Sequence, residues 1–400
     1  MKRSLVFFLA AVLLVIAFFA TSFLVLLLAE SYENTLKSQF YVGVSYCGNT
    51  IEGAKLLIDR VKSYTNLFVI SNTPISSDEN LLNEVCEYAI SSGLNIIVNL
   101  GTASQIDFEN YSFVPIWTWQ YQWLDEAKQR WDNKFLGVYY YDEPSGIQID
   151  APWSANASGS SFLNYDATAK FFEWVYKNDS GLVTLRDKNI TSITSDYVLY
   201  WFDYLAGYDV ILAELGWNQS SVQTIALVRG AATVQEKDWG IIVTWKYDNP
   251  PYLDSGEAIY RQLLTAYECG AKYEVIFNYP TYPANNTYGL LFEEHFEALQ
   301  RFWNDINAIS PAAHSSHRAE VALVLPRNYG WGMRAPDDKI WGAWNPDEKS
   351  SQIWNISREL LAKYGFSLDI VYEDPVFSTE GVYPKIFYWN ETDLLGAERR

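Results

Sequence analysis

The chain has 400 residues and a formal net charge of −19, with 29 Lys and Arg against 48 Asp and Glu. This acidity disfavours nucleic acid as a partner, because no basic stripe interrupts it. The length suits one large domain with an appendage, or two domains. Aromatic residues make up 16% of the chain, with 16 Trp and 29 Tyr. Such residues fill large cores, but Tyr and Trp also stack on sugar rings, so composition leans towards a carbohydrate partner without deciding it.

The chain opens with a long apolar segment. Residues 4–29 carry no charge, whereas Lys2 and Arg3 precede them and Glu30 follows. A transmembrane helix needs about 20 apolar residues, and the core of a cleaved signal peptide has roughly 7–15. The positive-inside rule places the N-terminus in the cytoplasm. We therefore expect residues 1–30 to form an uncleaved anchor in the cell membrane, a single-pass protein with its bulk extracellular. A cleaved signal segment is the alternative.

Asn-x-Ser/Thr sequons are frequent after the apolar segment. They begin at Asn110, Asn156, Asn178, Asn189, Asn218, Asn285, Asn355 and Asn390. This frequency predicts a glycoprotein with an extracytoplasmic surface, although a surface rich in Ser and Asn also produces sequons by accident.

The cysteines and histidines point to no metal centre. Cys47, Cys86 and Cys269 lie far apart, and their odd number leaves one of them unpaired. With no CxxC spacing and only three histidines, a zinc site is disfavoured. We expect no metal and no cofactor, and an extracellular location permits a disulfide without requiring one.

After a polar stem at residues 31–39, short apolar runs alternate with amphipathic stretches of helical length. The expected strands are Tyr41–Tyr46, Leu67–Ser71, Asn95–Leu100, Leu136–Tyr141, Asp209–Ala213, Gly240–Trp245, Tyr273–Asn278 and Glu320–Leu325. The expected helices are Glu52–Tyr64, Glu79–Ser92, Tyr121–Asn133, Ala167–Lys177, Ser221–Glu236, Gly256–Cys269 and Glu293–Ile309. The strands are almost continuously apolar, which is typical of parallel strands covered on both faces.

This alternation predicts an α/β fold, either a parallel (β/α)8-type barrel or an open doubly wound sheet. Seven units precede residue 310, and no Gly-rich phosphate loop follows the first strand, so we favour the barrel over residues 40–310. Residues 311–400 are expected to form either the eighth βα unit or a small, partial α/β module.

Polar residues that end the apolar runs are the candidates for chemistry, because a barrel carries its site at the C-terminal ends of its strands. Asp142 and Glu143 are adjacent carboxyl groups at such an end, and their repulsion and desolvation should raise one pKa, as a general acid requires. Glu214 follows another apolar run and could complete a carboxyl pair of the kind that hydrolyses glycosidic bonds. Structural alternatives remain: Glu143 as a cap, Asp142 in an ion pair, and Glu214 bridging to Arg229 or Lys246.

Aromatic and polar residues near the same strand ends could bind a substrate, although aromatic residues at a barrel mouth more often serve packing. The candidates for substrate binding are Tyr46, Trp117, Trp119, Tyr141, Trp217, Trp245, Lys246, Asp248, Asn278 and Tyr279.

The stretch Gly137–Pro144, GVYYYDEP, resembles the fourth-strand signature of TIM-barrel glycoside hydrolases, in which a Glu before Pro is the proton donor. The large retaining clan has Asn-Glu-Pro there and a nucleophilic Glu ending strand seven, whereas this chain has Asp142 for the Asn and Asn278 at the place expected for the nucleophile. The adjacent Asp-Glu pair is similar to substrate-assisted hexosaminidases. That resemblance implies Glu143 as the acid and Asp142 orienting an acetamido group, with Asn278 or Tyr279 as supporting donors.

Residues 319–375 resemble the extra α/β module that follows some glycosidase barrels. The resemblance implies a glycoside hydrolase acting on glycans, and the apolar segment at residues 4–29 makes it a membrane-anchored, extracytoplasmic one. The alternative is a catalytically inactive barrel that binds glycans or serves in the cell envelope. A metal-dependent deacetylase fits poorly, because histidine is scarce.

Overall fold

The computed structural model describes residues 40–71, 73–100, 106–107, 112–113, 118–152, 164–217, 219–279, 286–308 and 318–391. Residues Tyr41–Arg400 form one compact unit, apart from Met1–Phe40. The expected anchor at residues 4–29 and the stem at 31–39 lie outside the described residues. No helix within the described ranges is both long and apolar enough to cross a bilayer.

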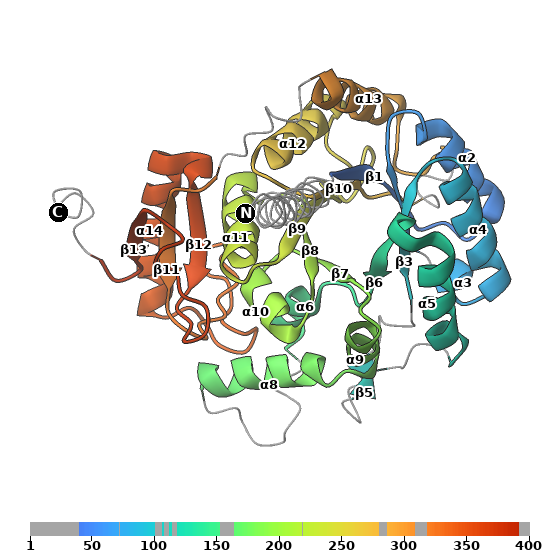
Figure 1. Cartoon of the computed structure of the whole chain (residues 1–400). Coiled ribbons are helices and arrows are strands. Elements are labelled where there is room, and N and C mark those ends of the chain that lie inside the picture. Colours follow the sequence, from blue (N-terminus) through green and yellow to red (C-terminus); the bar gives the residue numbers. More distant parts are fainter. Residues whose placement is uncertain are drawn as a thin grey trace, which may run out of the picture. The chain divides into compact units, whose positions relative to one another are not determined.

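The core of the compact unit is a closed barrel of parallel strands (Figure 1), as the sequence predicted. Pairing of the first strand with the last closes it, with Tyr41 opposite Tyr273. The barrel strands are β1 (Tyr41–Tyr46), β2 (Leu67–Ile70), β3 (Asn95–Asn99), β6 (Phe135–Tyr139), β7 (Ser192–Asp196), β8 (Val210–Leu215), β9 (Asp238–Val243) and β10 (Tyr273–Ile276). The short strands β4 (Ile106–Asp107) and β5 (Ser112–Phe113) pair with each other outside the barrel.

Helices surround the barrel on its outer side (Figure 1). They are α2 (Ile51–Val61), α3 (Thr73–Ser76), α4 (Glu79–Ser91), α5 (Thr118–Trp131), α6 (Pro144–Asp150), α8 (Tyr165–Lys177), α9 (Ser180–Asp187), α10 (Tyr200–Ala206), α11 (Ser221–Val234), α12 (Gly256–Glu268) and α13 (Glu293–Ala308). Several begin at side-chain caps: Thr50 accepts from Gly53 N–H before α2, and Asp78 accepts from two backbone N–H groups before α4.

One barrel strand was missed by the sequence analysis, and the error shifts the strand count. The fifth strand is β7, whose sequence Ser-Ile-Thr-Ser-Asp contains one aliphatic residue yet is buried along its whole length. Hydrophobic patterning cannot find such a strand, because its burial depends on hydrogen bonds made by its polar side chains. Glu214 therefore lies on the sixth barrel strand, Trp245 follows the seventh, and Asn278 follows the eighth.

Alternate residues of the strands fill the barrel interior. This core cluster is Tyr41, Leu67, Val69, Ile97, Tyr139, Ile193, Val210, Leu212, Ile242, Tyr273 and Val275. The rings of Tyr41 and Tyr273 stack 5.2 Å apart. Because a strand has a period of two, the same alternation assigns Ser195 and Glu214, two residues beyond Ile193 and Leu212, to the interior face.

The C-terminal residues form a separate module, so the stretch at 319–326 is not the eighth barrel strand. Its sheet has the order β12 (Leu368–Tyr372), β11 (Val321–Leu325) and β13 (Lys385–Tyr388), all parallel. The helix α14 (Glu348–Tyr364) connects β11 to β12 and begins at a capping box made by Asp347 and Ser350.

The module packs on the barrel through α11 and β12 (Figure 1). A Cβ on Gly230 of α11 would lie 2.8 Å from the carbonyl oxygen of Ile370, so the close approach requires glycine. Beside it, Arg229 of α11 donates to the Asp369 carboxylate of β12 at 2.8 Å, and both side chains are buried. A second contact joins the module to α6, where Gln148 donates to the carbonyl oxygen of Trp341 at 2.9 Å.

Candidate active site

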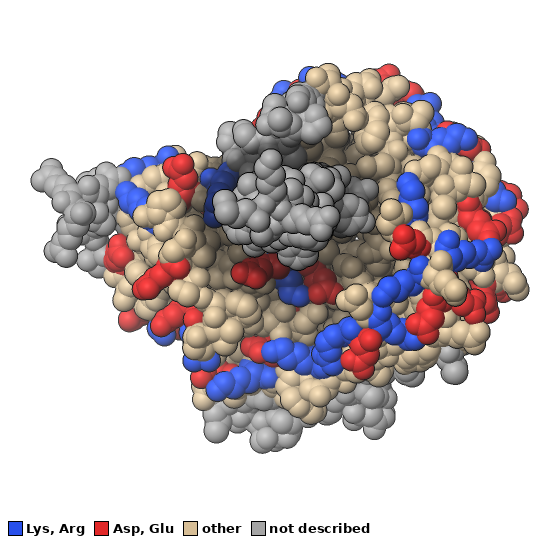
Figure 2. All heavy atoms as spheres, in the orientation of Figure 1, with Lys and Arg blue, Asp and Glu red and all other residues tan. Residues whose placement is uncertain are grey.

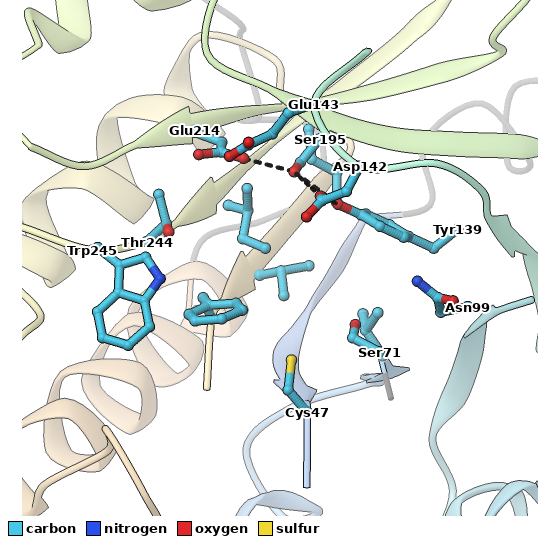
Figure 3. Close-up of a pocket in the computed structure, with 15 residues that line it drawn as sticks. Cys47, Ser71, Asn99, Tyr139, Asp142, Glu143, Ser195, Glu214, Thr244 and Trp245 are labelled. Atoms are coloured by element: carbon cyan, nitrogen blue, oxygen red, sulfur yellow. Dashed lines mark hydrogen bonds between the residues drawn. The ribbon is translucent and has the colours of Figure 1, made fainter. Parts of the chain in front are cut away.

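A cavity of about 150 Å³ lies at the C-terminal ends of the barrel strands (Figure 3). Its lining is polar on one side, apolar at its base and aromatic on the far side. The lining residues are Cys47, Val69, Ser71, Asn99, Tyr139, Asp142, Glu143, Ser195, Leu212, Glu214, Ile242, Thr244, Trp245, Val275 and Phe277. They come from all eight barrel strands or the residues just beyond them, which is where barrel enzymes carry their sites.

A hydroxyl network joins two of the carboxyl groups. Tyr139 Oη donates to Asp142 Oδ1 and lies 2.8 Å from Ser195 Oγ. Ser195 Oγ in turn lies 2.8 Å from Glu214 Oε1 and 3.3 Å from Asp142 Oδ1, with donor geometry to both. Since a serine has one hydroxyl proton, it can serve only one of these carboxylates at a time. Figure 3 shows Ser195 between Asp142 and Glu214.

The third carboxyl group completes a pair. Figure 3 shows the carboxyl groups of Glu143 and Glu214 side by side, and they lie within hydrogen-bonding reach. Two carboxylates side by side repel each other when both are ionised, which favours a state in which one of the two keeps its proton. Because no basic side chain is found among the lining residues that the structure describes, no ion pair offsets the repulsion.

Burial and mutual repulsion set the protonation of these groups. Desolvation, followed by the charge of Asp142, raises the pKa of Glu143 to about 7. Desolvation, followed by the charge of Glu143, raises the pKa of Glu214 well above its usual value. Asp142 is reached by solvent through the cavity but is otherwise surrounded by protein, and this desolvation raises its pKa despite the hydrogen bonds from Tyr139 and Ser195. The site therefore holds a proton near neutral pH.

The backbone around Asp142 is strained. Tyr141 and Glu143 on either side of it have φ of 66° and 50°, in the left-handed region that residues other than glycine rarely adopt. Such strain persists where the surrounding structure enforces it, and it clusters at functional sites. The turn directs both carboxyl groups into the cavity, as Figure 3 shows.

Asp196, at the end of β7, holds this turn from behind. Its buried carboxylate accepts hydrogen bonds from the backbone N–H groups of Ser145 (2.7 Å), Gly146 (3.0 Å), Tyr197 (2.7 Å) and Val198 (3.1 Å). The first two belong to the first turn of α6, so Asp196 caps that helix from a neighbouring strand. The helix follows directly after Glu143, and its start is thereby fixed relative to the barrel.

A second carboxyl pair lies beneath the same helix. Asp203 of α10 accepts from Ser145 Oγ at 2.5 Å and lies within hydrogen-bonding reach of Asp196. Both side chains are fully buried, and desolvation raises the pKa of each well above its usual value. Neither lines the cavity, so this pair serves the structure rather than a ligand.

The structure brings together four of the residues selected from the sequence: Asp142, Glu143, Glu214 and Trp245 all line the cavity. It also removes their structural alternatives. Glu143 is at the N-cap position of α6, but its side chain makes no cap hydrogen bond. Glu214 bonds neither Arg229, which pairs with Asp369, nor Lys246, which pairs with Asp254.

Three expected substrate-binding residues are buried away from the cavity. Tyr46 lies on the outer face of β1, where its hydroxyl donates to the carbonyl oxygen of Thr50. Tyr141 packs its ring edge against Tyr176. Asn278 accepts from Leu290 N–H at 3.0 Å and fixes the segment after β10. These strand ends turn the three side chains outward or into loop packing, so none of them lines the cavity.

The remaining expected residues lie at the rim or elsewhere. Trp217 and Tyr279 are exposed at the ends of β8 and β10, and Tyr279 stacks on the cavity residue Phe277. Lys246 forms an ion pair with Asp254, and Asp248 is exposed; neither lines the cavity, and nor does the partly buried Trp119 of α5. Trp117 lies outside the described residues.

Sequence reasoning missed several cavity residues. They are Cys47, Ser71, Asn99, Tyr139, Ser195, Thr244 and Phe277, with the apolar base of Val69, Leu212, Ile242 and Val275. Most are the last interior residues of their strands, so counting in twos along each strand would have found Tyr139 and Thr244. Ser195 was lost with its strand. Cys47 offers no thiolate, since burial raises its pKa to about 12.

No group of three His, Cys, Asp or Glu side chains within the described ranges could hold a metal ion. All three cysteines are buried, and none of them is in a disulfide. The site therefore presents carboxyl groups, hydroxyls and an aromatic wall. Such an arrangement can donate a proton and stabilise a developing positive charge.

The fold places the chain in the class of TIM barrels that resemble glycoside hydrolases. No family model matches the sequence, and no curated protein matches it either. The exact family is not established.

Solved structures of glycoside hydrolases share the fold. The GH5_18 protein of Streptomyces cattleya in complex with GlcNAc is 13% identical with a TM-score of 0.54, over 88% of this chain and 98% of that one. A variant of that protein in complex with Manb1-4GlcNAc is 11% identical with the same TM-score, over 88% and 99%. Alpha-L-fucosidase isoenzyme 2 of Paenibacillus thiaminolyticus is 12% identical with a TM-score of 0.52, over 87% of this chain and 60% of that one.

Proposed function

We propose that the protein is a membrane-anchored, extracytoplasmic glycoside hydrolase that acts on glycans, with Glu143 as the general acid and Asp142 assisting. The observation that carries this proposal is the adjacent carboxyl pair Glu143 and Glu214 beside Asp142, in a cavity at the C-terminal end of a barrel. The similar solved barrels are described as a fucosidase and as complexes with GlcNAc and Manb1-4GlcNAc, which supports a sugar ligand.

Glu143 is the group best suited to protonate a leaving oxygen. It is less buried than Glu214, faces the cavity and has a pKa raised to about 7, so it holds a proton near neutral pH. A general acid is most effective when its pKa lies close to the working pH. The left-handed backbone at Glu143 and the capped start of α6 keep the carboxyl in place.

Asp142 would orient the substrate and stabilise the positive charge that develops at the anomeric carbon. Tyr139 donates a hydrogen bond to its carboxylate, and it is the cavity carboxyl most open to solvent. An adjacent acid and orienting carboxylate are what a substrate-assisted reaction on an N-acetylated sugar requires. Such a reaction needs no carboxylate after the seventh strand, where this chain has Thr244.

Glu214 would take part through its contact with Glu143. Acid and partner carboxyl groups in glycosidases lie about 5–5.5 Å apart in retaining enzymes and about 6.5–9.5 Å apart in inverting ones. Here the carboxyl groups of Glu143 and Glu214 lie side by side (Figure 3). Substrate entry would separate them, and Ser195, which donates to Glu214, offers that carboxylate a replacement partner.

The sequence and the exposure of the sequon residues support the proposed location. The uncharged run at residues 4–29 supports a single membrane span with the barrel outside. The described sequon residues Asn178, Asn189, Asn355 and Asn390 are all exposed, as glycosylation requires. N-terminal sequencing of the mature protein tests the anchor: a first residue near 21 or 31 would contradict it.

The test of activity is a screen of the full-length protein, in non-ionic detergent, against chromogenic glycosides and glycan polymers. Glu143→Gln serves as the control for contaminating glycosidases. Turnover that is lost in the variant supports the proposal. Turnover by both proteins at the same rate, or by neither, contradicts it.

A catalytically inactive barrel that binds glycans is the second candidate. The absence of a carboxyl group at Thr244, after the seventh strand, and the contact between Glu143 and Glu214 favour it. Calorimetry measures binding of a glycan, and a day's incubation shows whether that glycan is hydrolysed. Saturable binding without hydrolysis would support this candidate over the first.

A further inference from the structure

The described part of the barrel mouth is poor in positive charge. It comprises the described residues, outside β4 and β5, between the end of each barrel strand and the next long helix. These residues are 47–50, 71, 73–78, 100, 140–152, 164, 197–199, 216–217, 219–220, 244–255, 277–279 and 286–292, and Lys246 is the one Lys or Arg among them. The same residues, with the end of β8, include Asp78, Asp142, Glu143, Asp150, Glu214, Asp248 and Asp254.

The basic residues near the mouth are already paired. Lys246 lies 3.7 Å from Asp254 and does not line the cavity. Arg334 reaches the mouth from the C-terminal module, where its guanidinium bonds Asp150 and Asp338, each at 2.8 Å. Neither cation is available to an anionic ligand in the cavity without breaking these pairs. In the orientation of Figure 2, Lys and Arg side chains alternate with Asp and Glu side chains over the visible surface.

The cavity itself has three carboxyl groups and no basic side chain among its described lining residues. Its other polar groups include the hydroxyls of Ser71, Tyr139, Ser195 and Thr244 and the amide of Asn99, which can donate hydrogen bonds to sugar hydroxyls or accept them. A negative substituent would lie close to Asp142 and to the charge of the Glu143 and Glu214 pair in a poorly solvated space, where repulsion is strong.

We infer that the cavity binds sugars that are uncharged or bear a free amine, and that it rejects sugars bearing a carboxylate or a sulfate. This inference rests on the proposed function, since it concerns the substrate of the same cavity. An ammonium group on the sugar would replace the missing cation and gain attraction from the carboxylates, whereas an anionic group would meet like charge.

The test is a set of matched methyl glycosides in gluco, manno and galacto configuration, each as the plain sugar, the 2-amino sugar and the uronate. Dissociation constants are measured on the full-length protein by calorimetry at pH 7 and low salt. Where the plain sugar binds, we expect the uronate to bind at least about 30-fold more weakly and the amino sugar several-fold more tightly. Raising the salt to about 0.5 M should reduce both differences.

Two variants with the same change in net charge separate local from general repulsion. Asp142→Asn removes a cavity charge and should reduce the preference against the uronate by about tenfold. Glu84→Gln removes an exposed charge on α4, paired with Lys55, and should leave the preference unchanged. A uronate that binds as well as the plain sugar overturns the inference while leaving hydrolysis possible. If none of the sugars binds, the result contradicts the proposed function and the inference together.

Discussion

Two buried carboxyl pairs lie on either side of one turn of chain, and they differ in access. Glu143 and Glu214 face the cavity, whereas Asp196 and Asp203 are sealed beneath α6. Burial and repulsion raise the pKa of both pairs. A perturbed pKa alone therefore does not distinguish a catalytic pair from a structural one. The two kinds of pair are distinguished by access to a ligand and by the hydrogen bonds of the carboxylate oxygens. Those of Asp196 accept from four backbone N–H groups.

The largest effect is expected at the cavity. Asp142→Asn should lower kcat on N-acetylated glycosides by about 10²–10³, the usual cost of removing one preorganised stabilising group. On plain hexosides the loss should be smaller, because no acetamido group needs orienting. Steady-state kinetics on the two substrate series measures the difference. Equal losses on both series would mean that Asp142 serves charge stabilisation alone.

The buried ion pair between Arg229 and Asp369 provides the next test. Arg229→Ala would leave Asp369 of the module unpaired inside the protein, and the free energy of unfolding should fall by about 3–5 kcal/mol. Chemical denaturation measures it. The double substitution Arg229→Met and Asp369→Leu should restore much of the stability, because it removes both charges. A harmless single substitution would show that the module contributes little to the stability of the barrel.

The sealed pair should act on stability and on position. Asp196→Asn places an amide where the carboxylate accepts from the first turn of α6, and the resulting mismatch should cost about 1–3 kcal/mol of unfolding free energy. Since the start of α6 fixes Glu143, kcat should fall and the pH profile should shift, with KM little changed. Asp203→Asn, which keeps the amide near Ser145 Oγ, is the milder matched variant. A loss of stability with unchanged kinetics would limit Asp196 to a structural role.

A substitution in the cavity pair should have the opposite effect on the free energy of unfolding: it should raise it, whereas Asp196→Asn should lower it. The pKa of Glu143 is raised from its usual value to about 7, so the folded state binds more protons than the unfolded state between these values. Stability from this group is therefore lost as the pH rises from about 4.5 to about 7. Glu143→Gln removes the repulsion and should be more stable than the wild type at pH 8, by about 1–3 kcal/mol, with little difference at pH 4.5. Thermal melts at the two pH values check it; a less stable variant at pH 8 would contradict the repulsion within this pair.

The smallest effect is expected at the rim. Trp217 is exposed at the end of β8 and does not line the cavity. Trp217→Ala should raise KM for oligosaccharides by a few fold, in line with the ~1 kcal/mol of an exposed aromatic contact, and leave monosaccharide glycosides unaffected. If KM is the same for the variant and the wild type on both kinds of substrate, Trp217 does not belong to the binding surface.

Much of the barrel could be predicted from the sequence, because most of its strands are continuous apolar runs. Tyr41–Tyr46 was predicted with the bounds that the structure has, and β2, β3 and β10 differ only at their ends. The failure was β7, where Ser192, Thr194 and Asp196 are buried through hydrogen bonds. Polar strands of this kind are invisible to hydrophobic patterning.

The candidate site divides in the same way. Asp142, Glu143 and Glu214 could be found because they follow apolar runs directly, and Trp245 follows from the same rule. The hydroxyl network could not, since Ser195 belongs to the missed strand and Tyr139 reads as core. The contact between Glu143 and Glu214 also could not be predicted, because it depends on the register and closure of the barrel.

The most direct test of the central claim compares wild type and Glu143→Gln on two glycosides of one sugar, with a poor and an activated aryl leaving group. If Glu143 donates the proton, the variant should lose about 10²–10⁴ in kcat on the poor leaving group. On the activated one the loss should be much smaller, since that group needs little protonation. Equal rates for both proteins on the poor leaving group would contradict the assignment of Glu143 as the acid.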